Sequence, residues 1–179
     1  MKITDVKLRF AKHYLFVQVY TDAGIVGLGE AGNWGYLQAT AAAIEKFADY
    51  LIGKDPFRIE DFNQNFLRSV YFRGSVIMSA ISAIDIALWD IKGKAYGRPL
   101  HEIFGGARRK DVRAYASQLQ FGWSHTDLHV PQLKPEDYAN VAKKAVFEEG
   151  YDALKYDFFS FDEEGRKISV EEYTRLLHP

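Results

Sequence analysis

Residues 80–106 read AISAIDIALWDIKGKAYGRPLHEIFGG, and this stretch decides the fold more than any other part of the chain. Its first half, extended back to residue 77, carries apolar residues at three- and four-residue spacing, which predicts a helix with one buried stripe. The stripe consists of Ile77, Ile81, Ile84, Leu88, Ile91 and Ala95. Ala80, Ala83 and Ala87 leave parts of the helix flat, so neighbouring elements can approach closely. We expect the helix to end at 97–99, Gly-Arg-Pro, because proline cannot continue it and glycine tolerates the turn.

The order of residues in this stretch closely resembles the signature of the mandelate racemase and muconate lactonizing enzyme group of the enolase superfamily, with Ile103 where leucine is usual. The resemblance extends over most of the chain. It implies an α+β N-terminal capping domain followed by a (β/α)8 TIM barrel, whose strand ends hold a divalent metal and the acid/base residues. The helix would belong to the capping domain. We therefore expect structural roles for its polar and aromatic residues Asp85, Trp89, Asp90 and Lys92.

Composition excludes several classes of function. The formal net charge of the 179 residues is −1, so nucleic-acid binding has no electrostatic support. The absence of cysteine excludes disulfides and thiolate metal sites. The apolar runs are too short to span a bilayer, and no signal-peptide core follows Met1. We expect a cytoplasmic protein with a small-molecule partner, and no nucleic acid or membrane.

Residues 1–110 are predicted to form the capping domain. Segments 2–10, 14–20 and 25–30 are rich in strand-forming residues and joined by short turns, which predicts a three-stranded antiparallel meander. The alternation of the first segment slips once near Asp5. Helical periodicity then covers 36–51 and about 58–69, ahead of the signature helix.

Residues 111–179 are predicted to begin the barrel. Segments 112–116 and 151–159 read as strands, with a helix between them that starts near Lys134 and ends at Gly150. Strand, helix, strand is one unit of a parallel sheet. Because a parallel sheet needs both faces covered, we expect a truncated barrel in a chain that continues naturally for about 200 more residues.

The strongest candidates for chemistry are Lys155 and Asp157. Residues two apart on a strand share a face, so Ala153, Lys155 and Asp157 are expected to point into the barrel. The resembling family places Lys-x-Lys here in several branches, with the second lysine as base. In this chain Asp157 stands in place of the second lysine. That arrangement resembles the sugar-acid dehydratases of the family, whose His/Asp base lies on later strands. A structural ion pair between Lys155 and Asp157 is the alternative.

Two loops of the capping domain are candidates for substrate contact, because in the resembling family they fold over the mouth of the barrel. The loop after the third strand offers Asn33 and Trp34, and the first hairpin turn offers His13 and Tyr14. Structural roles are the alternatives: a hydrophobic contact for Trp34 and a surface turn for His13. Arg73 could bind a carboxylate through its guanidinium group or hold the capping domain against the barrel.

Metal ligands are not assigned to this chain. The resemblance implies Mg²⁺ for the complete enzyme, held by three acidic residues on the third, fourth and fifth barrel strands. The loop with His125, Asp127 and His129 carries side chains of the types that bind metal ions, but the sequence does not determine their geometry. Contact with the substrate is the alternative role for this loop.

The function that these patterns favour is that of a Mg²⁺-dependent dehydratase of sugar acids, in which a proton next to the carboxylate is removed and a β-hydroxyl leaves as water. A racemase or epimerase of the same superfamily and a non-catalytic truncated paralogue are the alternatives. The 179-residue chain alone is expected to be inactive. The resemblance also implies a homo-oligomer of the complete protein.

Overall fold

The computed structural model describes residues 1–33, 35–68, 71, 73–121, 134–156, 169 and 171. The chain divides into two compact units, Met1–Arg108 and Arg109–Pro179. This division lies close to the boundary expected after residue 110, while the assignment of capping and catalytic roles to the two parts stays a prediction.

The first unit contains the predicted antiparallel meander, and its order is β1-β2-β3. The strands are β1 (Ile3–Ala11), β2 (Tyr14–Thr21) and β3 (Val26–Ala31). Every second residue of β2 is buried, beginning at Leu15, so one face of the sheet belongs to the core. The pairing of β1 with β2 shifts between Ile3 and Asp5, where the sequence alternation slips. The Asp5 carboxylate there accepts the N–H of Val6 at 2.8 Å.

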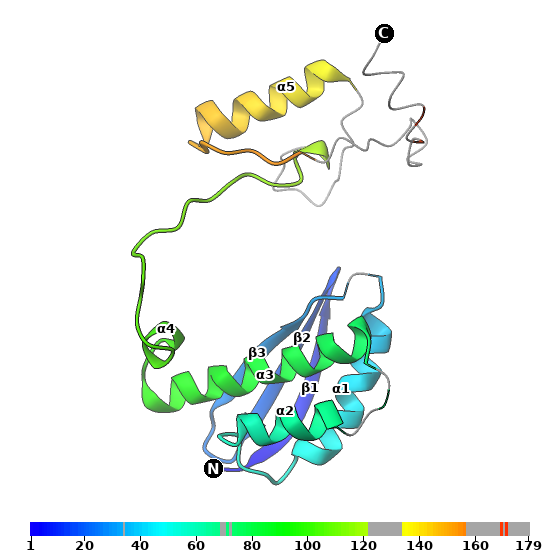
Figure 1. Cartoon of the computed structure of the whole chain (residues 1–179), viewed down its shortest axis with the longest axis vertical. Helices are drawn as coiled ribbons and strands as arrows, with labels where there is room; N and C mark the ends of the chain where they lie inside the picture. The colour runs from blue at the N-terminus through cyan, green and yellow to red at the C-terminus, as the bar shows by residue number, and fades with distance from the viewer. Residues whose placement is uncertain are drawn as a thin grey trace. The chain divides into compact units, whose positions relative to one another are not determined.

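Four helices follow the strands among the described residues of the first unit. They are α1 (Leu37–Leu51), α2 (Ile59–Arg68), α3 (Ser75–Tyr96) and the short α4 (Leu100–Ile103). Figure 1 shows α1, α2 and α3 on one side of the sheet, and their apolar residues share one core with the inner face of β2. Aromatic rings join α1 to α2: the centroids of Phe47 and Phe66 lie 4.3 Å apart. The three longer helices match those predicted from periodicity.

Helix α3 ends where the sequence predicts. Gly97 adopts a left-handed conformation with φ of 61°, which glycine reaches without a Cβ penalty. The N–H of Arg98 returns to the carbonyl of Gly93 at 3.0 Å, which satisfies one of the free carbonyls at the helix end. Pro99 then precedes α4.

Helix α3 approaches strand β3 so closely that only glycine fits at two positions of the strand. A Cβ at Gly27 would lie 2.1 Å from the carbonyl oxygen of Ala87, and one at Gly29 would lie 1.9 Å from that of Ala83. Both alanines are fully buried. Small residues on both elements therefore set the distance between the helix and the sheet, as the flat alanine positions of the signature predicted.

Two charged residues of α3 bind the free edge of the sheet. Asp90 accepts the backbone N–H of Leu28 at 2.8 Å, and Lys94 donates to the carbonyl of Val26 at 2.7 Å. Asp90 and Lys94 also pair with each other at 2.6 Å. Because β3 is an edge strand, its outer backbone groups have no neighbouring strand. The Asp90 carboxylate and the Lys94 ammonium group provide the hydrogen-bond acceptor and donor that such a strand would provide.

The other signature residues also have structural contacts, as expected. Asp85 accepts a hydrogen bond from the Asn63 amide of α2 at 2.7 Å. Trp89 meets the ring of Phe104 edge-on with centroids 4.6 Å apart, and the ammonium group of Lys92 lies 4.7 Å from the Trp89 ring. These contacts tie α3 to α2 and to the segment after α4.

The second unit contains α5 (Pro135–Lys143), which continues as the π-helix η2 (Lys144–Glu148), and the short 3₁₀ turn η1 (Leu119–Phe121). Ala116 and Leu154 form a parallel bridge. The N–H of Ala116 donates to Ala153 at 3.0 Å, and that of Lys155 donates to Ala116 at 2.8 Å. The parallel direction and the helix between the two segments fit the start of a (β/α) barrel.

The predicted extent of the two barrel strands was wrong for the described residues, since 112–115, 151–153 and 155–156 are not strand. Among the described residues the two segments pair only through the bridge of Ala116 with Leu154, and an isolated two-stranded ladder is marginally stable in water. Residues 157–159 lie outside the described ranges. None of the described helices is long and apolar enough to cross a membrane.

We predict that Gly29→Ala destabilises the protein by about 2–3 kcal/mol, because its Cβ would overlap the Ala83 carbonyl and force β3 away from α3. The measurement is the free energy of unfolding in urea. Gly32→Ala is the matched control, since a Cβ at Gly32 meets nothing within 4 Å. Equal stability of the two variants would contradict the close approach.

We also predict that Asp90→Ala lowers the free energy of unfolding by about 1–2 kcal/mol, since the Leu28 N–H loses its acceptor and Lys94 loses its partner. Asp49→Ala makes the same change on an exposed position of α1 and should alter stability by less than about 0.5 kcal/mol. The same urea titration checks both. A smaller effect at Asp90 than at Asp49 would show that the edge contact is not stabilising.

Candidate functional site

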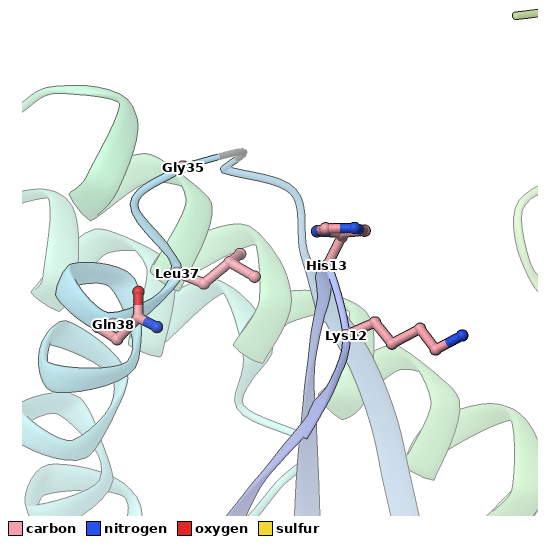
Figure 2. A pocket seen from close by; sticks show the side chains of 5 residues that line it. All are labelled: Lys12, His13, Gly35, Leu37 and Gln38. Carbon is pink, nitrogen blue, oxygen red and sulfur yellow. The ribbon is translucent and has the colours of Figure 1, made fainter. Parts of the chain in front are cut away.

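A hollow of about 210 Å³ lies between the first hairpin turn and the start of α1. Its lining residues are Lys12, His13, Gly35, Leu37 and Gln38. In Figure 2 the side chain of Leu37 points toward the hairpin, whereas that of Lys12 extends away from α1. The structure therefore brings together the two loops that the sequence analysis selected for substrate contact.

The hairpin turn is tight and carries a residue in an unusual conformation. Ala11 pairs with Tyr14, so Lys12 and His13 alone form the loop. Lys12 has φ of 52°, a region that glycine, asparagine and aspartate adopt more easily than lysine. The turn holds His13 exposed at the tip of the hairpin, on the rim of the hollow.

The facing loop is held by Asn33, which is 9% exposed. Its side-chain amide donates to the Thr40 hydroxyl at 3.3 Å, and its backbone carbonyl accepts the N–H of Tyr36 at 3.1 Å. The Thr40 hydroxyl in turn donates to the Tyr36 carbonyl at 3.1 Å. Gly35, with φ of 82°, closes the turn. Asn33 thus shapes the loop from inside, and its contact with substrate stays a prediction.

Tyr14 and Arg73 are not among the described residues that line this hollow. Tyr14 packs on the other face of the sheet, where its ring stacks with Phe16 at a centroid distance of 6.2 Å. Arg73 is exposed and directly precedes Gly74, the residue that caps the start of α3. Trp34 lies outside the described residues. Their roles in binding stay predictions.

In the second unit, Lys155 is exposed while its neighbours Leu154 and Tyr156 pack against the small core around Ala145. The Tyr156 hydroxyl donates to the Tyr138 carbonyl at 2.8 Å. Burial, and secondarily Tyr138, raises the pKa of Tyr156, so this hydroxyl stays protonated. The apolar residues thus face helix α5 and Lys155 faces away from it, the alternation expected for a barrel strand. Asp157 lies outside the described residues.

Sequence reasoning did not select Lys12 or Gln38 as binding residues. Gln38 lies in the first turn of α1 and carries no motif, so only its position beside the hairpin identifies it. For Lys12, the length of the turn was informative about its backbone. A two-residue hairpin loop of the common types requires a positive φ at its first position.

Among the described residues, no group of three or more His, Asp or Glu side chains could hold a metal ion. The loop with His125, Asp127 and His129 lies outside them. The described part of the chain therefore offers no magnesium site, and the location of the ligands stays a prediction.

Residues 4–105 match the family described as the mandelate racemase / muconate lactonizing enzyme, N-terminal domain. The chain belongs to this family. The match includes all three strands, the four helices up to α4 and both loops around the hollow. The predicted fold class is thereby confirmed: an α+β capping domain of the mandelate racemase and muconate lactonizing type, followed by barrel elements.

The chain is also similar to individual proteins, one of which is named as a sugar-acid dehydratase. The chain is 45% identical over 118 residues to D-galactonate dehydratase from Pectobacterium atrosepticum, a match that covers 65% of this chain and 31% of that protein. A member of the enolase superfamily from Salmonella Typhimurium superposes with a TM-score of 0.86 at 36% identity, covering 98% of this chain and 48% of that one.

An enolase from Pantoea ananatis, solved with bound d-gluconate and magnesium, superposes with a TM-score of 0.69 at 35% identity. This match covers 86% of the chain and 35% of the Pantoea protein. The chain therefore spans at most about half the length of these three relatives.

We predict that Lys12→Gly raises the free energy of unfolding by roughly 0.5–1 kcal/mol, because glycine adopts the positive φ of this turn without strain. Ala11→Gly, on the adjacent strand residue, should lower it by a similar amount. Urea unfolding of both variants checks the pair. Destabilisation by Lys12→Gly would show that the turn is not strained.

Proposed function

We propose that this chain is the N-terminal portion of an acid-sugar dehydratase. The observation that carries the proposal is the 45% identity with a D-galactonate dehydratase over 118 residues. The bound d-gluconate of the Pantoea neighbour supports the same substrate class. The proposed substrate is a hydroxylated monocarboxylate of this kind.

The proposed reaction is β-elimination of water. A base removes the proton at C2, beside the carboxylate, and the hydroxyl at C3 leaves with a proton as water. The resulting enol then becomes a 2-keto-3-deoxy acid, so no oxidant or reductant is consumed. The difficult step is the first, because a proton beside a carboxylate is a very weak acid and its removal places a second negative charge on the substrate.

Within this reaction, the proposed work of the capping domain is to close over the substrate and recognise its hydroxyls. His13 and Gln38 offer hydrogen-bond donors and acceptors on one hollow, with Lys12 adding positive charge at the same turn. Gly35 and the buried Asn33 fix the facing loop. These groups suit a polar anionic ligand.

Lys155 is proposed to lie near the substrate carboxylate, where its ammonium group would stabilise the charge that develops when the C2 proton leaves. The parallel bridge at Ala116 fixes its backbone, and its side chain is exposed on the side opposite the core. Asp157 would act beside it. Tyr14, Trp34 and Arg73 remain proposed contacts of the substrate or of the closed capping domain.

A Mg²⁺ requirement belongs to the proposal for the complete enzyme. The Pantoea neighbour was solved with magnesium, and the enolate chemistry benefits from a divalent cation. The residues described in this chain supply no ligand cluster, so no ligand is assigned here.

The test is turnover of a panel of sugar acids by the complete enzyme in the presence of Mg²⁺. We predict formation of a 2-keto-3-deoxy acid from a six-carbon sugar acid, and none with the 179 residues alone. His13→Ala should lower kcat/KM about tenfold, mainly through KM, because the proposed contact of His13 with the substrate lies outside the reacting carbons.

Lys46→Ala, on the exposed side of α1, is the control and should leave kcat/KM unchanged. Exchange or inversion at C2 without loss of water would instead identify a racemase or epimerase. An absence of any reaction across the panel would favour a non-catalytic protein.

A further inference from the structure

One residue in the buried stripe of helix α1 is polar. The buried residues of this helix are Leu37, Thr40, Ala41, Ile44, Phe47, Ala48 and Leu51, and all except Thr40 are apolar. Thr40 has no exposed surface. A buried hydroxyl costs free energy unless it is hydrogen-bonded, and threonine is a weaker helix former than alanine or leucine. Departures of this kind from local rules are expected at functional or strained sites.

The Thr40 hydroxyl joins α1 to the turn in front of the helix. It donates to the Tyr36 carbonyl at 3.1 Å and accepts the Asn33 side-chain amide at 3.3 Å. A hydroxyl can donate one hydrogen bond and accept others, so both of its capacities are used. Tyr36, the residue before the helix, contributes no capping hydrogen bond from its side chain. In the described part of this loop, the side-chain link between the turn and α1 is therefore the Asn33–Thr40 bond.

This turn leads directly into one wall of the hollow. Gly35 lies within the turn, and Leu37 and Gln38 follow it at the start of α1 (Figure 2). The backbone carbonyl of Asn33 accepts the Tyr36 N–H at 3.1 Å, and Gly35 has φ of 82°. A change in the turn would therefore move the wall that these residues form.

Loss of the Thr40 hydroxyl would act on the turn and not on the helix. In Thr40→Val, the Tyr36 carbonyl keeps the backbone N–H of residue 40, at 3.0 Å in the present structure. The Asn33 amide instead loses the hydroxyl as its acceptor. Asn33 is only 9% exposed, and a buried donor without an acceptor is costly. The amide regains a partner by moving toward water, which displaces the turn.

We propose that Thr40 is a positioning residue of the hollow, whose hydroxyl holds Asn33 inside the domain and so fixes the turn before α1. Because Thr40 has no exposed surface, it acts on a ligand through this turn and not by contact. The inference rests on the proposed function, which assigns the hollow to the substrate.

The first test is the steady-state kinetics of the complete enzyme with a sugar acid that it converts. Thr40→Val should raise KM about fivefold, the effect of roughly one lost hydrogen bond, and leave kcat within about twofold. Thr40→Ser keeps a hydroxyl on the same carbon atom. It should return KM to within about twofold of the parent value.

Thr21→Val is the matched control, since Thr21 is also buried. The Thr21 hydroxyl donates to the Ile25 carbonyl at 2.8 Å and accepts the Ile25 N–H at 3.1 Å. Thr21 ends β2, whereas the hairpin turn beside the hollow precedes this strand. Thr21→Val should lower the stability of the protein without changing KM. An equal rise of KM in the Thr21 and Thr40 variants would indicate general destabilisation and overturn the proposal.

A double variant tests whether Asn33 and Thr40 act through one bond. Asn33→Ala should raise KM, and Thr40→Val added to it should raise KM no further, because the shared interaction is already lost. Effects that multiply in the double variant would show that the two residues act independently. That result would overturn the role of the Thr40 hydroxyl in holding Asn33.

Hydrogen exchange separates this inference from the proposed function. In the complete enzyme, Thr40→Val should speed deuterium uptake of peptides that contain Tyr36, whose N–H is bonded within the turn, and Thr21→Val should not. Faster uptake in Thr40→Val, combined with no turnover of any sugar acid by the parent enzyme, would support the anchor and overturn the proposed function. Unchanged uptake together with unchanged KM in Thr40→Val would overturn the inference itself.

Discussion

The contact between helix α3 and strand β3 determines how the capping domain is built. The strand presents Gly27 and Gly29 to the helix, and a Cβ at either position would collide with a helix carbonyl. At this distance Asp90 and Lys94 reach the edge of β3 and satisfy its backbone. A larger separation would lose both the packing and the edge contact at once. The close approach therefore fixes the orientation of the sheet, and with it the positions of the hairpin turn and the loop before α1.

That geometry explains why the candidate site lies at the tips of the loops and not on a face of the sheet. Alternation along the strands sends one set of side chains to the helices and the other set to the outer face. The tips of the hairpin and of the facing loop lie beyond the strands, where the backbone can take unusual angles such as those of Lys12 and Gly35. Strain at Lys12 is maintained because the paired strands on both sides of the turn leave the chain little choice.

The second unit illustrates where sequence patterns fall short. Leu154 and Tyr156 face the small core and Lys155 faces away, as the alternation predicted, but the expected strands reduce to a single bridge at Ala116. Propensity for a strand is realised only where a neighbouring segment pairs with it, and sheet context decides how strongly. Local sequence can predict which way each side chain points; it cannot supply partners that lie elsewhere.

The sequence by itself determined the elements of the capping domain, the end of α3 at Gly97 and the membership of the enolase superfamily. These follow from periodicity, turn residues and residue order, all of which are local in the chain. Only the tertiary structure decided that Gln38 borders the same hollow as His13 and that Asn33 is bound internally by Thr40. Those relations join residues through strand register and helix packing, and their energies depend on distances that no local pattern encodes.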